Sequence, residues 1–422
     1  MSHVVIIGCG VVGAAIAYEL SQVPGLKITV LDKQPPAQAA TKAALGVLMA
    51  VISHKIKGKA WQMRMASIQR YETLIPELVA LTGHQIPFNR QGILMLLPSD
   101  SQFEFEQDLA NWEKLAQARA ATGWQLEIWD QAKVKSRCPQ INCDAEGGSL
   151  RDHRYQAAVY SPQDRQVDPV SLTLALVEGA KRNGVTFHFG VTVEAYNLTT
   201  TTKHQHQVQQ IKTKSLEVEP PLIYDVDWLV VSAGLGSLQL LQTIQESLKL
   251  GGVGEATTIL PHSPHLPLSP SSSSPAIDIR PVLGQAIHLK LSHPLGNQDF
   301  QPVITANDVH IVPCGGGIQA TEYWVGATVE FPLDSKDVVA EPARLEQVMQ
   351  QAIALCPALA QSSIIRTWSG LRPRPEGRPA PIIGHLTGFS NVLLATGHYR
   401  NGVLLAPATA GVISQMILNP TF

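Results

Sequence analysis

A glycine-rich stretch at the start of the chain restricts the possible folds more than any other part of the sequence. The apolar residues 4–7 (VVII) predict a short buried strand, and GCGVVGAAIAYELSQ after them predicts a glycine turn followed by a helix. Residues 27–33 (KITVLDK) predict a second buried strand, with Asp32 near its end. Strand, turn, helix and strand in this order form a βαβ unit, so a parallel sheet is expected.

The three glycines of this turn, Gly8, Gly10 and Gly13, have the GxGxxG spacing of a dinucleotide-binding loop. The first permits the sharp bend, the second lets the backbone approach a pyrophosphate, and the third lets the helix pack closely on the strand. The amides at the start of the helix then face the diphosphate, and Asp32 accepts hydrogen bonds from a ribose. The alternative is a glycine turn that binds no ligand. The motif does not separate NAD from FAD, because both cofactors use it.

The later elements indicate a dinucleotide domain that is assembled from separate parts of the chain. At about residue 34 the βαβ pattern gives way to a loop of small residues, QPPAQAATKAALGVLMAV, whose backbone can lie against a flat ring system. Residues 168–184 predict a helix with Asp168 as its N-cap, and residues 227–237 predict another buried strand that runs into a glycine turn. An uninterrupted NAD domain would continue with regular βαβ units, so this pattern favours a flavoprotein.

Three other segments have a distinctive composition. Residues 59–82 have helical periodicity, with Pro76 expected to kink or divide the helix. Residues 199–220 are polar and loosely alternating, as in an exposed β-meander, and residues 261–275 are rich in Pro and Ser, as in a mobile loop. We interpret the histidines of these two segments as surface residues and expect no metal site, because no acidic or Cys ligand accompanies them; they are His204, His206, His262 and His265.

Composition excludes several classes of protein. The 422 residues are 45% hydrophobic and carry a formal net charge of −2 without a block of Lys and Arg, so a nucleic-acid partner is not expected. The five cysteines are odd in number and form no CxxC pair, which favours a reducing compartment over a disulfide framework. We find no signal peptide and no apolar run of the roughly 18 residues that a membrane helix needs. The chain is therefore expected to be cytoplasmic, without a membrane span.

Motifs in order along nearly the whole chain resemble the FAD-dependent D-amino acid oxidase superfamily, and within it the glycine oxidase branch linked to thiamine biosynthesis. They are VVIIGCGVVGAAIAYEL, TKAALGVLMA, RQVDPVSLTLALVEGAKRNGV, DWLVVSAGLGS, RPVLGQ, VGATVE, WSGLRPRPEGRPAPIIG and GHYRNGVLLAPATAGVIS. The resemblance implies a mixed α/β fold with two domains. One is a discontinuous Rossmann-like FAD-binding domain of residues 1–85, 152–240 and 366–422. The other is a mostly antiparallel β-sheet substrate domain of residues 86–151 and 241–365.

The resemblance also implies which residues hold FAD. They are Gly8, Gly10, Val11, Val12, Gly13, Asp32, Lys33, Ala40, Thr41, Leu45, Gly46, Val47, Val193, Ala233, Gly234 and the segment His398, Tyr399, Arg400, Asn401, Gly402, Val403 and Leu404. Sarcosine oxidases attach their flavin through a cysteine, and the matching segment here, LRPRPEGRPAP, has none. We therefore expect FAD to be bound noncovalently.

Two arginines face the substrate in glycine oxidases, and they match Arg372 and Arg400 here. A guanidinium fork pairs with a planar carboxylate through two parallel charge-assisted hydrogen bonds. The alternative for either arginine is an internal salt bridge, for which Glu376 is a local candidate beside Arg372. Arg374 and Arg378 are interpreted as structural or loop residues.

One position departs from the family pattern. Glycine oxidases carry a tyrosine before IVP that assists carboxylate binding, and the corresponding residue here is His310. Its imidazole can still donate a hydrogen bond, or it can widen the pocket or change the pH response. Glycine is therefore not fixed as the substrate.

The resemblance implies oxidative deamination of a small amino acid or amine acid, such as glycine, sarcosine or a D-amino acid. The products are a 2-oxo acid, ammonia and hydrogen peroxide, with molecular oxygen as the acceptor. One alternative is a secondary-amine dehydrogenase of the proline type with another acceptor. A second is a flavin-binding assembly or sensor protein without turnover. A homo-oligomer is compatible with all three.

Overall fold

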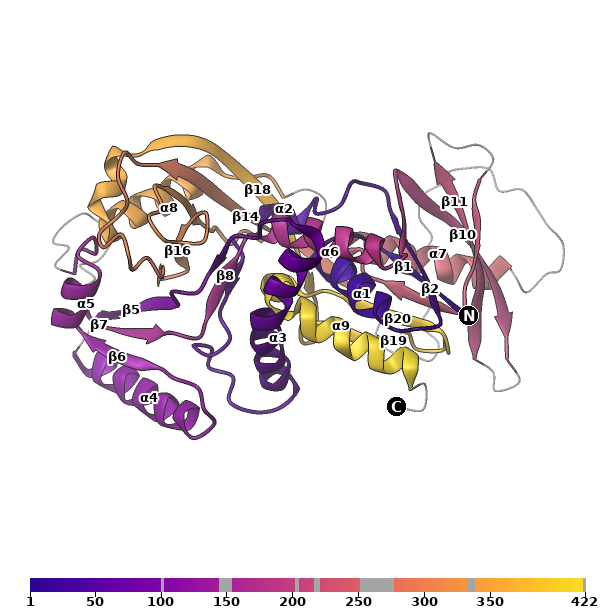
Figure 1. Cartoon of the computed structure of the whole chain (residues 1–422), viewed down its shortest axis with the longest axis horizontal. Coiled ribbons are helices and arrows are strands. Elements are labelled where there is room, and N and C mark those ends of the chain that lie inside the picture. Colours follow the sequence, from indigo (N-terminus) through magenta and orange to yellow (C-terminus); the bar gives the residue numbers. More distant parts are fainter. Residues whose placement is uncertain are drawn as a thin grey trace.

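The computed structural model describes residues 1–99, 102–143, 154–201, 205–215, 221–250, 277–331 and 338–419. Two large sheets dominate it (Figure 1). A six-stranded sheet occupies the middle of the molecule, and an eight-stranded sheet lies at one end with α4, α5 and α8 beside it. The mixed α/β fold expected from the sequence is confirmed.

The six-stranded sheet has the order β19-β20-β13-β1-β2-β9. All neighbouring strands in it are parallel except β19 and β20. Its strands are β1 (Ser2–Ile7), β2 (Leu26–Asp32), β9 (Thr186–Phe189), β13 (Trp228–Val231), β19 (Ile382–His385) and β20 (Val392–Thr396). β13 and β20 come from late in the chain but lie beside β1, so this domain is discontinuous, as expected.

Helices cover one face of this sheet and a small antiparallel sheet covers the other. The helices are α1 (Val11–Ser21), α3 (Lys59–Thr82), α6 (Pro169–Arg182) and α9 (Gly402–Leu418), and they pack against one another over the main hydrophobic core. The small sheet consists of β10 (Val191–Thr200), β11 (His206–Ser215) and β12 (Ile223–Asp225). Together with α7 (Ser237–Leu250) it encloses a second apolar cluster that includes Val5 and Leu31. The result is a three-layer arrangement.

The eight-stranded sheet has the order β18-β14-β17-β16-β15-β5-β7-β6 and is antiparallel except where β15 pairs with β5. Its strands are β5 (Ile93–Ser99), β6 (Glu127–Asp130), β7 (Arg154–Ser161), β14 (Ile279–Lys290), β15 (Val303–Ala306), β16 (Val309–Pro313), β17 (Glu322–Gly326) and β18 (Ser363–Pro375). Helices α4 (Gln102–Ala120), α5 (Gln131–Arg137) and α8 (Pro342–Leu355) pack on it.

Short elements join the two large sheets. They are α2 (Ala40–Ala43), a three-stranded sheet of β3 (Val47–Leu48), β8 (Arg165–Val167) and β4 (Phe88–Asn89), and the 3-10 turns η1 (Gly234–Gly236) and η3 (Tyr399–Asn401); a third 3-10 turn, η2 (Pro357–Gln361), follows α8 and leads into β18. Helix α2 contacts β18, so the small-residue loop after β2 lies against the edge of the substrate-side sheet.

Most local expectations are confirmed. Asp168 caps α6 by accepting a 2.7 Å hydrogen bond from the Ser171 amide, and β10, β11 and β12 form the expected β-meander. Pro76 does not divide α3, which runs as one helix from Lys59 to Thr82. The Pro/Ser-rich segment at 261–275 lies outside the described residues.

The expected domain boundaries need correction at three places. Strands β7 and β18 belong to the eight-stranded sheet, although the boundaries at 152 and 366 assign them to the FAD-binding domain. Helix α7 packs against β10, although most of it lies after the boundary at 240. The physical reason is strand pairing: β18 forms a long antiparallel ladder with β14, and β7 pairs with β5 and β6.

The expectation that no apolar run is long enough for a membrane helix was also wrong. By length and composition, Tyr399–Leu418 could cross a membrane, and 56% of its apolar window is buried inside the structure. Core helices of soluble proteins meet the same criterion. This segment contains α9, which packs between α1 and α3 over the six-stranded sheet (Figure 1).

Candidate active site

The glycine turn after β1 has the close packing that its spacing predicts. Gly8 has a φ of 108°, and a Cβ there would overlap the Ser232 carbonyl group. A Cβ at Gly13 would overlap the Gly8 carbonyl oxygen. Any side chain at either position would separate the turn from its neighbours, so helix α1 can approach β1 this closely only because both residues are glycine.

Asp32, at the end of β2, is hydrogen-bonded to the backbone of this glycine turn. Its Oδ2 accepts a 2.6 Å hydrogen bond from the Cys9 amide, and its Oδ1 accepts a 2.9 Å hydrogen bond from the Gln34 amide. Each carboxylate oxygen keeps a further lone pair that can accept a hydroxyl proton. The geometry therefore fits a ribose contact at Asp32.

The small-residue loop docks onto the same turn. The Oγ1 of Thr41 accepts a 3.0 Å hydrogen bond from the Val11 amide, and the Trp368 indole donates a 3.1 Å hydrogen bond to the Ala43 carbonyl. Gly46 has a φ of 72°, and a Cβ there would overlap the Val167 carbonyl oxygen. The loop thus connects the glycine turn to strand β18.

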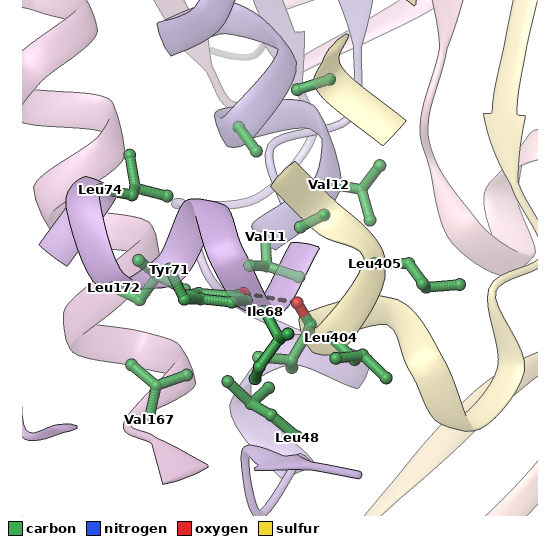
Figure 2. Close-up of a cluster of buried hydrophobic side chains, with 14 of the residues drawn as sticks. Val11, Val12, Leu48, Ile68, Tyr71, Leu74, Val167, Leu172, Leu404 and Leu405 are labelled. Atoms are coloured by element: carbon green, nitrogen blue, oxygen red, sulfur yellow. Dashed lines mark hydrogen bonds between the residues drawn. The ribbon is translucent and has the colours of Figure 1, made fainter. Parts of the chain in front are cut away.

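The start of α9 lies beside the start of α1. Figure 2 shows Val11 and Val12 in one apolar cluster with Leu404 and Leu405. The Tyr71 hydroxyl donates a 2.5 Å hydrogen bond to the Val403 carbonyl oxygen, drawn as the dashed line in Figure 2. Residues that the sequence separates by nearly 400 positions therefore line one region of the structure.

The first turns of α1 and α9 suit an anionic cofactor. Neither helix has a side-chain hydrogen bond at its N-cap, and neither has an acidic residue in its first turn. Apart from the Val11 amide, which donates to Thr41 Oγ1, the first-turn amides of α1 have no side-chain acceptor among the hydrogen bonds of the described residues, and no first-turn carboxylate offsets the positive end of either helix dipole. With Asp32 and the glycine turn, these residues fit the diphosphate and ribose of FAD.

Four further residues expected to hold FAD lie at the edge of this region or inside the protein. Val193 packs against the cluster that contains Leu31, and Ala233 and Gly234 follow β13 at the carboxyl end of the sheet. His398 is 4% exposed, and its Nε2 lies 3.0 Å from the Thr409 hydroxyl. Its side chain belongs to the interior of the protein, so a contact with FAD would use its main chain.

Arg372 on β18 is the first of the two arginines expected to face the substrate. Its Nη1 donates 3.1 Å hydrogen bonds to the carbonyl oxygens of Leu283 and Thr328. Burial, and then the nearby charge of Arg400, lower its pKa. Within the described part of the chain no carboxylate forms an ion pair with Arg372. Glu376, the candidate nearby in the sequence, pairs with Arg374 at 3.2 Å instead. The salt-bridge alternative through Glu376 is therefore wrong.

Arg400 does have a carboxylate partner. Its Nη1 lies 3.2 Å from Oδ1 of Asp308, and 42% of its side chain is exposed. The salt-bridge alternative is thus realised at this arginine, through a residue 92 positions away. Sequence reasoning missed Asp308, because nothing near Arg400 in the chain points to the turn between β15 and β16.

His310 lies close to both arginines. It sits on β16 between Thr305 of β15 and Gly326 of β17, and its Nδ1 is buried with no hydrogen-bond partner in the structure. Burial lowers its pKa to about 4, and the positive charges of Arg400 and Arg372 contribute in the same direction. The fold thus brings together the three residues that the sequence singled out, and it leaves a buried polar atom among them.

Comparison with known proteins identifies the family. The model of the DAO family, described as FAD dependent oxidoreductase, matches residues 3–416. The chain belongs to this family. FAD is accordingly its cofactor, and oxidation–reduction is its class of reaction.

Individual relatives and structures agree with this assignment. The bifunctional protein ThiO/ThiG of Synechocystis is 30% identical over 99% of the chain, which spans 52% of that relative, or about half its length. The glycine oxidase of Bacillus subtilis is 26% identical over 98% of the chain and 92% of the relative. The crystal structure of glycine oxidase from Bacillus cereus is 22% identical, with a TM-score of 0.73 over 100% of this chain and 96% of that one. The last of these shows a shared fold.

Proposed function

We propose that the chain oxidises a small amino acid or amine acid, such as glycine, sarcosine or a D-amino acid, to a 2-oxo acid and hydrogen peroxide, with release of ammonia from a primary amine or of methylamine from sarcosine. The observation that supports this most directly is Arg372, a largely buried cation with no ion-pair partner among the described residues. A buried guanidinium without a counter-ion is costly, and an arriving carboxylate removes that cost. This arrangement supports the binding of an organic acid.

The proposed role of Arg372 is to fix the substrate carboxylate. Two main-chain carbonyls hold its Nη1, so the orientation of the guanidinium is set before a ligand arrives. Its other N–H groups remain for a forked, charge-assisted contact. Noncovalently bound FAD supplies the redox chemistry. The protein supplies position, and restricting the acid to one orientation accounts for a large part of the rate enhancement.

His310 takes the place of the family's tyrosine in this proposal. With a pKa of about 4 its imidazole is neutral at physiological pH, so it acts as a hydrogen-bonding group and adds no charge. Its buried Nδ1 lacks a partner in the structure, and in this proposal a bound substrate supplies one. We place the reaction in the cytoplasm and in thiamine biosynthesis, the setting of the glycine oxidase branch that the motifs resemble.

An anaerobic bleaching screen tests the proposal. The FAD-loaded protein is mixed with glycine, sarcosine, D-alanine or proline without oxygen, and the visible flavin absorbance is followed before and after air is admitted. We expect at least one compound to bleach the flavin, and air to restore the colour with release of peroxide and, for glycine or D-alanine, of ammonia. Bleaching that only a quinone reverses would identify a dehydrogenase. A flavin that no amine acid bleaches would refute oxidation of these substrates.

A further inference from the structure

We propose that Asp308 makes the acid-binding site selective for substrates with one carboxylate over substrates with two. This inference rests on the proposed function and names the substrate class of the same site. It depends on a difference in ion pairing between the two arginines. Arg372 has no ion-pair partner in the described structure, whereas Arg400 is already paired with Asp308 at 3.2 Å.

The turn that carries Asp308 fixes its position. Asn307 and Asp308 link β15 to β16, with Ala306 opposite Val309, and their φ angles are 47° and 66°. Two central residues with positive φ form the tight hairpin turn that matches the twist of paired strands. Asp308 therefore sits on a short, well-defined turn at the start of β16, the strand that carries His310.

The charges around Arg372 show why Asp308 is the group that matters. Arg400, Asp308 and Glu330 all act on it electrostatically. Glu330 is 2% exposed, and its carboxylate accepts hydrogen bonds from Gln285 Nε2 at 2.8 Å and from the Glu341 amide at 3.2 Å. Its acceptor capacity is thus used inside the protein. The Asp308 side chain is 68% exposed, so its charge is the one that an arriving ligand meets.

The consequence for ligands follows from Coulomb's law. An acid with one carboxylate can pair with Arg372 while Arg400 keeps its ion pair with Asp308. A second carboxylate on the same molecule could pair with Arg400 only by displacing Asp308, and the negative charge of Asp308 would repel it. Unfavourable like-charge contacts of this kind are a common means of rejecting a wrong ligand.

The variant Asp308→Asn tests the proposal directly. Asn tolerates positive φ, so the turn is retained while the charge is removed. Dissociation constants of acetate and of malonate are measured at low ionic strength through the perturbation of the flavin spectrum. We expect the variant to improve malonate binding relative to acetate by about two- to fivefold, the range for a partly exposed ion pair. Equal gains for the two acids, or no malonate binding by the variant, would overturn the proposal.

Two further measurements sharpen the test. Asp299→Asn removes an exposed carboxylate in the segment between β14 and β15. It should leave the ratio of the malonate and acetate affinities unchanged. Sarcosine and iminodiacetate differ by one carboxylate, so kcat/KM for this pair should shift in the same direction in Asp308→Asn. Because acetate and malonate report binding without turnover, a protein that binds acids but oxidises none would refute the proposed function and still decide the role of Asp308.

Discussion

The guanidinium of Arg372 lies over the α-carbon of Gly284, so closely that a Cβ on Gly284 would overlap it. The register of the two strands produces this contact. Arg372 is opposite Val282 and Gly284 is opposite Gly370, so the arginine side chain crosses to the neighbouring strand and reaches two residues along it. The glycine of the RPVLGQ motif therefore provides the surface on which the proposed carboxylate-binding group rests.

Replacing Gly284 by Ala is expected to impair activity without unfolding the protein. The added methyl group would displace the guanidinium from its hydrogen bonds to Leu283 and Thr328 and leave the backbone in place, so the loss of stability should be about 1–3 kcal/mol, as for overpacking at other sites. A displaced guanidinium no longer holds the acid in position, and kcat/KM should fall about 10²-fold. Gly411→Ala is the control, because a Cβ there meets no atom within 4 Å. Unchanged kinetics in Gly284→Ala would contradict the proposed role of Arg372.

Arg372→Ala should retain FAD and lose turnover. Two charge-assisted hydrogen bonds of roughly 1.5–3 kcal/mol each would be lost, which lowers kcat/KM by about 10²- to 10⁴-fold. The matched control is Arg374→Ala on the same strand, which removes a partly exposed ion pair with Glu376 and should alter kcat/KM by less than about fivefold. Flavin absorbance reports the cofactor and steady-state kinetics report turnover. Similar losses in both variants would show that the effect is structural.

The features of the fold that the sequence predicted are those that depend on residues close together in the chain. Gly8 and Gly13 adopt the turn that their spacing implies, and Asp168 caps the helix that follows it. These features are local, since a positive φ or a capping hydrogen bond involves residues a few positions apart. The family motifs likewise led to Arg372 and His310, which the structure brings together.

The features that the sequence did not reveal depend on contacts between distant segments. Asp308 meets Arg400 across 92 positions, and Asp164 reaches residues 50–52 across more than 110. Neither carboxylate belongs to a motif, and each could equally have been a solvated surface group. The assignment of β18 to the substrate-side sheet was missed for the same reason, because strand pairing is not encoded in the strand alone.

Asp164 organises the loop that follows β3. It is fully buried and accepts hydrogen bonds from the amides of residues 50–52 at 2.7 to 2.8 Å. Arg119, 2% exposed, donates to carbonyl oxygens of the same loop, including that of Val51 at 2.8 Å. Each charge lowers the cost of burying the other, and the loop backbone satisfies both.

Asp164→Asn is expected to destabilise the protein by about 3 kcal/mol or more. An amide nitrogen would face a backbone donor, and the buried Arg119 would lose its compensating charge. Unfolding in urea measures the loss. Asp278→Asn, which removes an exposed pair with Arg280, should change stability by no more than about 1 kcal/mol. An Asp164→Asn protein as stable as the Asp278→Asn control would show that the loop does not depend on this carboxylate.

His398 should make the protein less stable in mild acid. Burial lowers its pKa from 6.5 to about 4, so the folded protein keeps the imidazole neutral while the unfolded chain takes up a proton below pH 6.5. The stability contribution is complete above pH 6.5 and declines as the pH falls towards 4, by about 2 kcal/mol between pH 7 and pH 5. Urea unfolding at these two pH values measures the decline. His398→Gln should show a smaller difference between them, whereas His385→Gln, at an exposed histidine, should behave as the parent does. An unchanged difference in His398→Gln would mean that other buried groups, such as His310, carry the acid sensitivity.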